Sequence, residues 1–570
     1  MDRKHLAAAF EEAAVLLELL GENPFKVRAY NQAARALLGL EGDLVALAAS
    51  GDLAKVKGLG KTLSAHAAEL IQTGRLEYLA ELKNSIPAGL LEILQVPGLG
   101  PKKVKLLHDH LGVKSLGELE YACRENRLVA LKGFGAKTQA NVLRGLETLK
   151  KYRGRFLWAE VEGPALELQK RLAQCPVISR VEPAGSFRRL KETVKDLDFA
   201  AATASPAEAA RFVHNLDLVE AVTSGGETKI SFRLKAGPNV DLRLVPPEAF
   251  SFALHHFTGS REHNALLRQR AKALGYKLNE YGLFDAEGHT PAALDEAGVF
   301  GLLGLPFIPP ELREGLGEIE AAARGELPAL ISPSDLKGVF HVHSAYSDGG
   351  LTIAELAAAS RDLGFEYLGL SDHSRSAFYA GGLQLEDLER QQDEIEKVRR
   401  QYPDLTIFWG IESDILPDGS LDYPDDILAR FDFVVASVHS HFHLPEPDMT
   451  RRLIRAVQNP HATILGHPTG RLLLAREPYA LDLGAVLAAA AAAGTAVEIN
   501  ANPHRLDLDW RELRAAKALG LKTFICPDAH SATGLKDARF GVNIARKGWL
   551  TAADVVNCLN REEMADWLKK

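Results

Sequence analysis

The sequence predicts a multidomain protein of α+β and α/β architecture, with a helical first region, a mixed-sheet middle and a parallel β/α barrel at the end. Residues 1–155 place apolar side chains at helical spacing without strand alternation. Residues 156–325 mix β-rich runs, such as KISFRL and NVDLRLV, with helical stretches, which predicts a mostly antiparallel sheet. From Gly338 onward, seven short apolar runs end in polar residues and are mostly separated by helical stretches, the pattern of a seven-stranded barrel.

Length and cysteine usage set the broad class. The 570 residues exceed what one hydrophobic core organises, so about three or four domains are expected. No apolar run approaches the roughly 20 residues that span a bilayer, and the first residues lack the features of a secretion signal. The four cysteines lie far apart without a CxxC pair, which fits buried thiols in a reducing compartment. We therefore expect a cytoplasmic protein without membrane contact.

The net charge of −8 hides an uneven distribution. Residues 1–155 carry 23 Lys and Arg against 17 Asp and Glu, whereas the remaining residues carry 44 against 58. A basic first region on an acidic body suits a protein that grips a polyanion at one end. A solvated helical face would produce the same excess, so charge alone leaves both interpretations open.

A short Gly-x-Gly phrase recurs between the helices of the first region. It occurs as KGLGK at 57–61, PGLGPKK at 97–103 and KGFGAK at 132–137, each time before a new amphipathic helix. A helix N-terminus binds phosphate through unpaired N–H groups, and glycine allows a close approach. One such phrase is usually only a tight turn, but three with the same flanks resemble helix–hairpin–helix motifs, which hold DNA by its backbone. The DNA-binding candidates are Gly58, Gly60, Gly98, Gly100, Lys102, Gly133 and Gly135.

Three aspartates in the middle region form a candidate metal site. Asp196 and Asp198 lie two apart in a strand-like run, so their side chains share one face. Neighbouring carboxylates repel one another unless cations neutralise them. Asp241, in NVDLRLV, could join them from a neighbouring strand. Three carboxylates can hold two magnesium ions about 4 Å apart, although an isolated Asp-x-Asp is also common on surfaces.

The segment GSFRRLKETVKDLDF resembles the nucleotidyltransferase signature of family X DNA polymerases, and the resemblance continues through NVDLRLVPPEAF, HHFTGSREHN and KLNEYGLF. It covers roughly residues 1–320. It implies a polymerase that fills short gaps during DNA repair, acting on gapped or primer-template DNA with dNTPs. It further implies that Asp196 and Asp198 bind two Mg²⁺ or Mn²⁺ ions and that Asp241 helps deprotonate the primer 3′-hydroxyl. The implied nucleotide-binding residues are Gly185, Ser186, Arg189, Phe257, Gly259, Asn264 and Arg268.

The sequence departs from this family at two places. His256 stands where a tyrosine is often found, which leaves discrimination between ribose and deoxyribose undetermined. His66 stands where the family's Schiff-base lysine is expected, and an imidazole cannot form that imine. Thr62 likewise replaces a usual phosphate-binding lysine, whereas Lys26 and Tyr30 match other contacts to a DNA 5′-phosphate. We therefore do not expect the family's lyase reaction by its usual route.

Ten of the 19 histidines follow Gly338, most of them at the ends of predicted strands. A lone histidine is usually a satisfied core or surface residue, but several converging at one end of a barrel would be costly without a metal. His341 and His343 share one strand, which predicts that both imidazoles lie on the same face. The candidate ligands are His341, His343, Asp348, His373, Glu412, His439, His467, Asp528 and His530. Nine N and O ligands without a thiolate suit two or three Zn²⁺ or Mn²⁺ ions, with Glu412 as a bridge.

The ordered motifs HVHSAYSDG, SDHS, GIES, SVHS, GHP and PDAH resemble those of the PHP (polymerase and histidinol phosphatase) superfamily over residues 338–570. The resemblance implies a metal-dependent phosphoesterase and, joined to the polymerase half, a 3′→5′ exonuclease acting on DNA 3′ ends or abasic sites. Arg375 and Arg471 are candidates for binding substrate phosphate, with plain surface arginine as the alternative. The remaining histidines of this half are left outside the ligand set: His441, His443, His461 and His504.

The expected organisation is a lyase-like helical domain, fingers, palm, thumb, linker and PHP barrel, with boundaries at 1–85, 86–155, 156–245, 246–320, 321–337 and 338–570. We expect a monomer. Two rival interpretations stay open at this point. The barrel could be a phosphatase of the histidinol-phosphate type for small molecules, or the polymerase half could be an idle DNA-binding module that delivers a nuclease. Intact Asp196, Asp198 and Asp241 count against the second.

Overall fold

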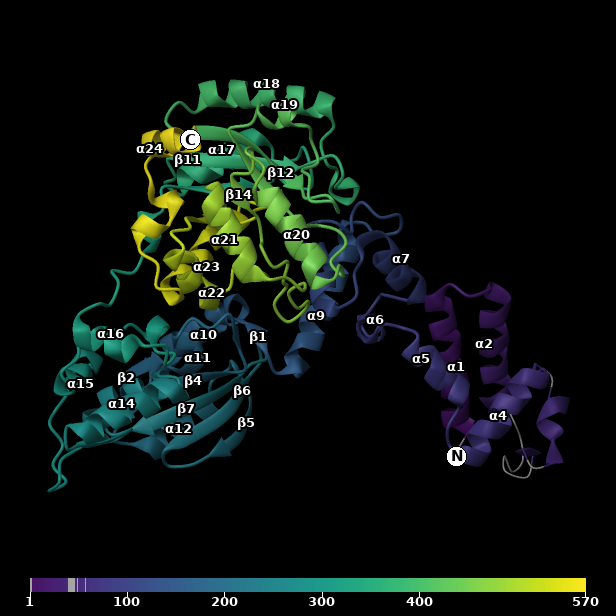
Figure 1. The fold of residues 1–570 in the computed structure, drawn as a ribbon. Coiled ribbons are helices and arrows are strands. Elements are labelled where there is room, and N and C mark those ends of the chain that lie inside the picture. Colours follow the sequence, from purple (N-terminus) through teal and green to yellow (C-terminus); the bar gives the residue numbers. More distant parts are fainter. Residues whose placement is uncertain (1–2, 39–46, 49, 57, 570) are drawn as a thin grey trace. The chain divides into compact units, whose positions relative to one another are not determined.

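The computed structural model describes residues 3–38, 47–48, 50–56 and 58–569, and the chain divides into two compact units, residues 1–149 and 150–570. The described part of the first unit is helical (Figure 1). Its helices are α1 (Arg3–Leu20), α2 (Pro24–Leu38), η1 (Asp52–Lys55), α4 (Lys61–Thr73), α5 (Glu77–Asn84), α6 (Ala88–Ile93), α7 (Pro101–Leu111), α8 (Leu116–Arg124) and α9 (Ala136–Arg153), which runs into the second unit. Their apolar faces meet in one core that includes Phe10, Leu63 and Leu107.

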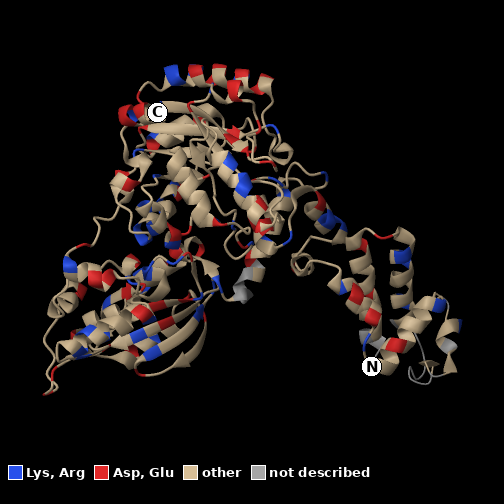
Figure 2. Cartoon of the chain, viewed as in Figure 1, with Lys and Arg blue, Asp and Glu red and all other residues tan. Residues whose placement is uncertain are grey.

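The three Gly-x-Gly phrases lie directly before α4, α7 and α9, as the sequence predicts. The first glycine of each phrase, Gly58, Gly98 or Gly133, has a φ near +90 to +100°, a conformation that glycine adopts without strain. The apolar residue between the glycines is buried in all three, so each turn is anchored in the core while its glycines face outward. Lys57 lies outside the described residues. Lys, Arg, Asp and Glu are interspersed over this unit, and three lysines, Lys102, Lys103 and Lys105, lie at the start of α7 (Figure 2).

The second unit begins with a five-stranded sheet of order β2-β4-β7-β6-β5. Only β4 and β7 run parallel, so the sheet is mostly antiparallel, as predicted. Helices α10 and α12 cover one face and α13 packs on part of the other. The bounds are β1 (Phe156–Leu157), α10 (Trp158–Leu172), β2 (Ile178–Pro183), α11 (Gly185–Arg188), β3 (Thr193–Val194), β4 (Asp196–Thr203), α12 (Pro206–His214), β5 (Val219–Gly225), β6 (Lys229–Leu234), β7 (Asn239–Val245), η2 (Pro247–Ala249) and α13 (Phe250–Thr258).

A smaller helical layer follows the sheet, with its own core around Phe252, Leu267 and Phe300. It carries a short β-hairpin, β8–β9. Its elements are α14 (Arg261–Ala273), β8 (Lys277–Asn279), β9 (Gly282–Phe284), α15 (Glu296–Leu302), η3 (Pro310–Leu312), α16 (Glu318–Arg324) and η4 (Pro333–Asp335).

The last region is a parallel barrel in which the seven strands neighbour one another in chain order. The barrel closes where Val342 bridges Ala529, and the N–H of His343 donates to the Ala529 carbonyl at 2.9 Å. Its strands are β10 (Gly338–Val342), β11 (Tyr367–His373), β12 (Thr406–Asp414), β13 (Phe433–Ser437), β14 (Ile464–Leu465), β15 (Ala496–Asn500) and β16 (Thr523–Cys526). Its helices are α17 (Ile353–Asp362), α18 (Leu385–Gln401), α19 (Asp425–Leu428), α20 (Glu446–Val457), α21 (Leu483–Ala493), α22 (Trp510–Ala518), α23 (Ala538–Lys547) and α24 (Arg561–Leu568).

Each of the seven strands contributes a side chain to one apolar cluster inside the barrel, which includes Phe340, Phe433 and Phe524. Helix α24 adds Met564 to the same cluster. The interior is therefore packed rather than open, and polar chemistry is confined to the carboxyl ends of the strands. None of the helices in the described ranges combines the length and apolar character that crossing a membrane requires.

Candidate active sites

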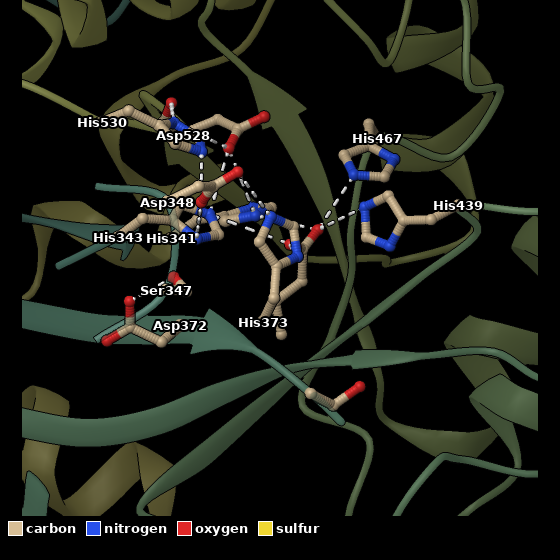
Figure 3. Close-up of polar contacts among 12 residues, drawn as sticks. His341, His343, Ser347, Asp348, Asp372, His373, His439, His467, Asp528 and His530 are labelled. Carbon is tan, nitrogen blue, oxygen red and sulfur yellow. Dashed lines mark hydrogen bonds and ion pairs between the residues drawn. The ribbon is translucent and has the colours of Figure 1, made fainter. Parts of the chain in front are cut away.

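All nine residues that the sequence singled out in the barrel come together at the carboxyl ends of its strands (Figure 3). They form four overlapping groups of potential ligands. The groups are His343, Asp348, His373 and His530; His341, Glu412 and His467; His341, His343 and Asp528; and His373, Glu412 and His439. Within each group the potential ligand atoms lie within 4.8 Å of one another. Because the groups share members, the arrangement fits a compact site for two or three ions.

Glu412 lies at the centre of this cluster. Its Oε1 is 3.0 Å from Nε2 of His341 and 3.0 Å from Nε2 of His467. The same oxygen is 3.2 Å from Nε2 of His439, while Oε2 is 2.8 Å from Nδ1 of His373. One carboxylate that faces four imidazoles is positioned as the predicted bridge between ions.

The local backbone around these residues departs from regular strand geometry. The pairing of β10 with β11 is irregular between Val339 and Val342, and His341 has a φ of 60°. His341 lies at this irregularity and His343 lies beyond the end of β10. The regular strand alternation on which the prediction relied therefore does not describe this segment, although the centroids of the two rings do lie 5.3 Å apart. His467 and Asp528 also have positive φ. Such conformations persist only where surrounding contacts hold them, and they concentrate at functional sites.

Two carboxylates that the sequence analysis missed orient the imidazoles. Oε1 of Glu498 is 2.5 Å from Nδ1 of His341, and its Oε2 accepts from the backbone N–H of His467. Oδ1 of Asp414 is 2.6 Å from Nδ1 of His439. A carboxylate on the far nitrogen of a histidine fixes its tautomer and makes it a stronger metal ligand. A signal was present in GIESD, because Asp414 ends β12 two residues after the predicted ligand Glu412, and in AVEIN, because Glu498 is an acid inside the buried strand β15.

Replacing Asp414 with Asn should weaken metal binding without removing a ligand. The amide keeps the shape of the carboxylate but removes the negative charge that holds His439, and losses of this kind lower metal affinity about 10–100-fold. Titration of metal-stripped protein with Mn²⁺ checks this. Asp426→Asn, on the short helix α19, is a control for loss of an acidic residue elsewhere in the barrel. Equal Mn²⁺ affinity in the two variants would contradict the role of Asp414.

Asp372 holds the loop that carries Asp348. It is fully buried and accepts hydrogen bonds from the backbone N–H and Oγ of Ser344 and from Oγ of Ser347 (Figure 3). Nε2 of Gln391 donates to it at 2.6 Å. Burial raises the pKa of Asp372, whereas the serine hydrogen bonds oppose that rise. This network holds the start of the loop that follows β10, and the sequence analysis did not predict it.

The donor set fits metal ions. The imidazoles of His343 and His373 are both buried, and their ring nitrogens face carboxylates without hydrogen-bond geometry: Nδ1 of His373 lies 2.8 Å from Oε2 of Glu412, and Nε2 of His343 lies 3.3 Å from Oδ1 of Asp528. Burial and the neighbouring imidazoles of His530 and His373 lower the pKa of His343 to about 3, which keeps its ring neutral and able to donate a lone pair. Buried polar atoms normally find partners, so this crowding of lone pairs calls for cations.

The two arginines proposed for substrate phosphate are engaged elsewhere. Arg471 is buried, its Nε donates to the carbonyl of Arg505 at 3.0 Å, and it contacts Asp509 and the carbonyl of Leu506. It therefore holds a loop and does not fit the phosphate role. Arg375 donates to the Asp422 carbonyl at 2.6 Å.

The four histidines left outside the ligand set, His441, His443, His461 and His504, belong to none of the four groups. If strand β13 continued past its last residue, alternation would point His441 and His443 to the same side as His439. Strand β13 ends at Ser437, and His441 is exposed with a φ of 57°. The continued strand is therefore absent.

The three aspartates of the middle region share one face of its sheet. Asp198 pairs with Asp241 across the parallel strands β4 and β7, and Asp196 lies two residues earlier on the same face. In this structure Asp241 is held by Nζ of Lys229 at 2.6 Å and by Oγ of Ser231 at 2.6 Å. Burial raises the pKa of Asp198 to about 6, and the charges of Asp196 and Asp241 add to the rise. A carboxylate that resists ionisation among other carboxylates fits a site that cations complete.

The pKa of Asp198 predicts a pH-dependent stability for the metal-free protein. Its folded-state value of about 6 exceeds the unfolded value of about 4, so the folded state binds more protons between these limits. The contribution to stability is complete below about pH 4 and is lost as pH rises through about 6. Asp198→Asn should therefore raise the free energy of unfolding in EDTA at pH 8 by on the order of 1–2 kcal/mol. The melting temperature should rise accordingly at pH 8 but not at pH 4. Asp566→Asn, an exposed acid on α24, should show no such difference.

Two glycines shape the nucleotide-binding candidates. Gly185 has a φ of 58°, and a Cβ at this position would lie 2.1 Å from Oδ2 of Asp198. A Cβ on Gly259 would lie 2.4 Å from Oδ1 of Asn264, whose Nδ2 donates to the His256 carbonyl at 2.7 Å. Glycine is required most strictly at Gly185, where a Cβ would meet both the positive φ and Asp198, whereas a Cβ at Gly259 would force the Asn264 side chain to move.

The other nucleotide-binding candidates lie on or directly after α11, on α13 and on α14. Ser186 lies on α11, beside Gly185. Arg189 follows α11, and its NH1 donates to the Thr258 carbonyl at 2.8 Å. The ring of Phe257 lies 4.9 Å from the guanidinium of Arg243, and Arg268 is exposed one turn beyond Asn264 on α14.

The candidate 5′-phosphate residues lie in an aromatic cluster of the first unit. The hydroxyl of Tyr30 lies 2.9 Å from Nδ1 of His66, and the ring of His66 stacks on that of Tyr78 with 5.1 Å between the ring centroids. The ammonium of Lys26 lies 5.5 Å from the centroid of the same tyrosine ring. The structure thus brings Lys26, Tyr30 and His66 together and adds Tyr78, which the sequence analysis did not select. Burial lowers the pKa of His66, so its ring is neutral at physiological pH.

Family comparisons agree with this division of the chain. Families described as helix-hairpin-helix domain, SAM-like helix-hairpin-helix tandem, DNA polymerase beta thumb and PHP domain match residues 1–76, 90–148, 253–314 and 340–502. The DNA polymerase/3′-5′ exonuclease PolX of Bacillus subtilis is 39% identical over 573 residues, covering 100% of both chains.

Shorter relatives match the barrel half. A probable phosphatase of Thermoanaerobacter sp. is 28% identical over 38% of this chain and 88% of its own. One from Caldicellulosiruptor saccharolyticus is 30% identical over 34% of this chain and 80% of its own. The full-length similarity, the thumb and hairpin matches and the barrel together make this chain a member of the bacterial family X DNA polymerases that carry a C-terminal PHP domain.

Proposed function

We propose that the chain extends DNA 3′ ends at Asp196, Asp198 and Asp241 and shortens DNA 3′ ends at the barrel cluster. The observation that carries the first activity is the pairing of Asp198 with Asp241 on one sheet face, beside the loop of Gly185. The second rests on the nine converging ligands. The full-length relative from Bacillus subtilis, named for both activities, supports having both in one chain. Filling of short gaps during repair is the proposed cellular use.

In the polymerase site, Asp196, Asp198 and Asp241 would hold two Mg²⁺ or Mn²⁺ ions. Such ions supply charge stabilisation for the attacking and leaving oxygens of an in-line displacement. Asp241 would help to remove the proton of the primer 3′-hydroxyl, and Lys229 would then have to release that carboxylate. Ser186 and Arg189 bind the triphosphate, Phe257 and Gly259 line the sugar pocket, and Asn264 and Arg268 face the new base pair. The dNTP is thereby oriented before reaction.

In the barrel, the nine ligands would hold two or three Zn²⁺ or Mn²⁺ ions, which supply Lewis acidity toward a phosphodiester and its attacking water. Glu498 and Asp414 orient the histidines, and Asp372 fixes the loop of Asp348. The hairpin glycines and Lys102 bind the DNA backbone, and Lys26 and Tyr30 bind a 5′-phosphate. We do not propose the imine-forming lyase step, because His66 replaces the amine.

One gapped duplex tests both activities. With Mg²⁺ or Mn²⁺ and dNTPs the wild-type protein should lengthen the primer, and without dNTPs it should shorten the primer from its 3′ end. Products separated by length show both. A protein that did neither on this substrate would contradict the proposal.

A second candidate concerns the barrel alone. Its similarity to probable phosphatases favours hydrolysis of a small phosphomonoester. Hydrolysis of histidinol phosphate or p-nitrophenyl phosphate at a rate above that of DNA shortening would favour this alternative. A rate on both small substrates far below that on a recessed 3′ end would exclude it.

A further inference from the structure

We infer that the barrel positions the nucleotide-binding loop of the polymerase site, and that Lys547 of α23 is the residue through which it acts on Arg189. This inference rests on the proposed triphosphate role of Arg189. Residues 187–192, here called the nucleotide loop, lie in the same compact unit as the barrel and contact it through Arg189, Lys191 and Glu192.

Lys547 ends α23 and is fully buried, with about 1% of its surface exposed. Its Nζ donates to the carbonyl of Arg189 at 2.8 Å, to the carbonyl of Glu311 at 3.2 Å and to Oε1 of Glu314 at 2.9 Å. A buried ammonium is costly unless its donors are satisfied, and here all three partners come from the polymerase half.

Glu314 links the lysine to the arginine side chain. Its Oε1 accepts from Lys547 and lies 3.2 Å from Nε of Arg189, while its Oε2 lies 3.1 Å from Nζ of Lys191. Lys547 thus holds the backbone carbonyl of Arg189 directly and the Nε of Arg189 through Glu314, while NH1 of the same arginine donates separately to the Thr258 carbonyl. Removing Lys547 frees the carbonyl and leaves Glu314 with a changed set of partners.

The backbone of the loop needs such support. Leu190 is a non-glycine residue with a φ of 55°, an unfavourable conformation that persists only when neighbours impose it. Its side chain lines a small cleft with Leu506, Phe540 and Ile544 of the barrel. Barrel residues therefore line the same small cleft as the strained residue directly beside Arg189.

The two ends of the loop are braced as well. At the start, the Phe187 carbonyl accepts from Nε1 of Trp158, whose ring lies edge-on to Phe540 at 6.0 Å. At the end, Glu192 accepts from NH1 of Arg511 at 2.9 Å. Contacts at the start, middle and end of the segment distinguish a positioning surface from a single docking contact.

The same interface supplies a matched control. Arg539 also lies on α23, and its guanidinium makes two hydrogen bonds, of 2.6 and 2.5 Å, to Glu162 of α10. This ion pair joins the halves without touching the nucleotide loop. Arg539→Ala therefore reports what loss of an interface contact does by itself.

The test uses the full-length protein on gapped DNA and measures kcat and KM for one dNTP, the rate of 3′ shortening and the melting temperature. Lys547→Met keeps the aliphatic stem and removes the three donated bonds. We expect a rise of about tenfold in the dNTP KM, a smaller change in kcat and an unchanged shortening rate. Arg539→Ala should leave the dNTP KM within about twofold of wild type. The same dNTP KM in both variants would overturn the inference.

A second variant keeps the test valid if Lys547→Met does not fold. Glu314→Gln removes the charge that links Lys547 to Arg189, and it should raise the dNTP KM in the same way. The double variant should be no worse than the poorer single variant, because the two residues act through one contact. An unchanged KM in Glu314→Gln, or fully additive effects, would overturn the coupling. If Arg189→Ala leaves the KM unchanged in a protein that still extends DNA, the triphosphate role of Arg189 fails, and the coupling with it.

Discussion

Asp198→Ala should abolish primer extension while leaving 3′ shortening intact. Asp198 neighbours both Asp196 and Asp241 on the sheet face. Its removal takes away the carboxylate that would bind the metal ions together with the other two. We expect the rate of extension to fall by at least about a thousandfold, equivalent to about 4 kcal/mol of transition-state stabilisation. The measurement is single-turnover extension on gapped DNA with Mg²⁺.

The variant also discriminates between the interpretations of the polymerase half. Asp217→Asn, an exposed acid of the same domain, is the control and should extend normally. If Asp198→Ala lost both extension and shortening while keeping its melting temperature, the two activities would share one site. If it lost neither, the polymerase half would be a DNA-binding module and the extension would come from elsewhere.

Glu412→Gln should do the reverse, abolishing 3′ shortening and sparing extension. Gln has the same shape, but it lacks the charge and the second strong ligand oxygen of a carboxylate that faces four imidazoles. Two of the four ligand groups contain Glu412, so its loss weakens more than one ion position. We expect shortening to fall at least about a thousandfold. Metal analysis of the purified variant should show fewer bound ions than in the wild type.

His461→Ala is the control for this variant, since His461 lies in the barrel but belongs to none of the ligand groups. It should shorten DNA at the wild-type rate. A Glu412→Gln protein with full shortening activity would show that the cluster does not catalyse it. A variant that also lost extension without unfolding would contradict the separation of the sites.

Much of the barrel site could be predicted from the order of the strands and the residue types at their ends. Because parallel strands of a barrel all end at one rim, acids and histidines at the strand ends had to converge, and all nine did. The same reasoning could have selected Glu498 and Asp414, but in sequence they look like ordinary acids in or at the end of a strand. Whether such an acid binds a metal ion or orients a histidine depends on the direction in which the ring nitrogens point. That direction depends on local backbone irregularities such as the one at His341.

Contacts between segments far apart in the chain were not predictable in this way. Arg471 looks like a phosphate ligand in sequence, yet the Asp509 loop folds back on it. Lys547 ends an ordinary amphipathic helix, and nothing in that helix indicates a contact with Arg189, 358 positions away. Periodicity describes which face of an element is buried, but it contains no information about the element that buries it. The domain boundaries remain predictions for the same reason.

The parallel pairing of β4 with β7 constrains how this chain can diverge. Asp198 and Asp241 face the same side only while that pairing holds its register. A single inserted or deleted residue inside either strand, upstream of its aspartate, would turn that carboxylate to the opposite face of the sheet. Length changes in the turn between β5 and β6 would not, because they leave the register of β7 against β4 untouched. Insertions and deletions among descendants of this sequence should therefore collect at that turn and avoid the two strands.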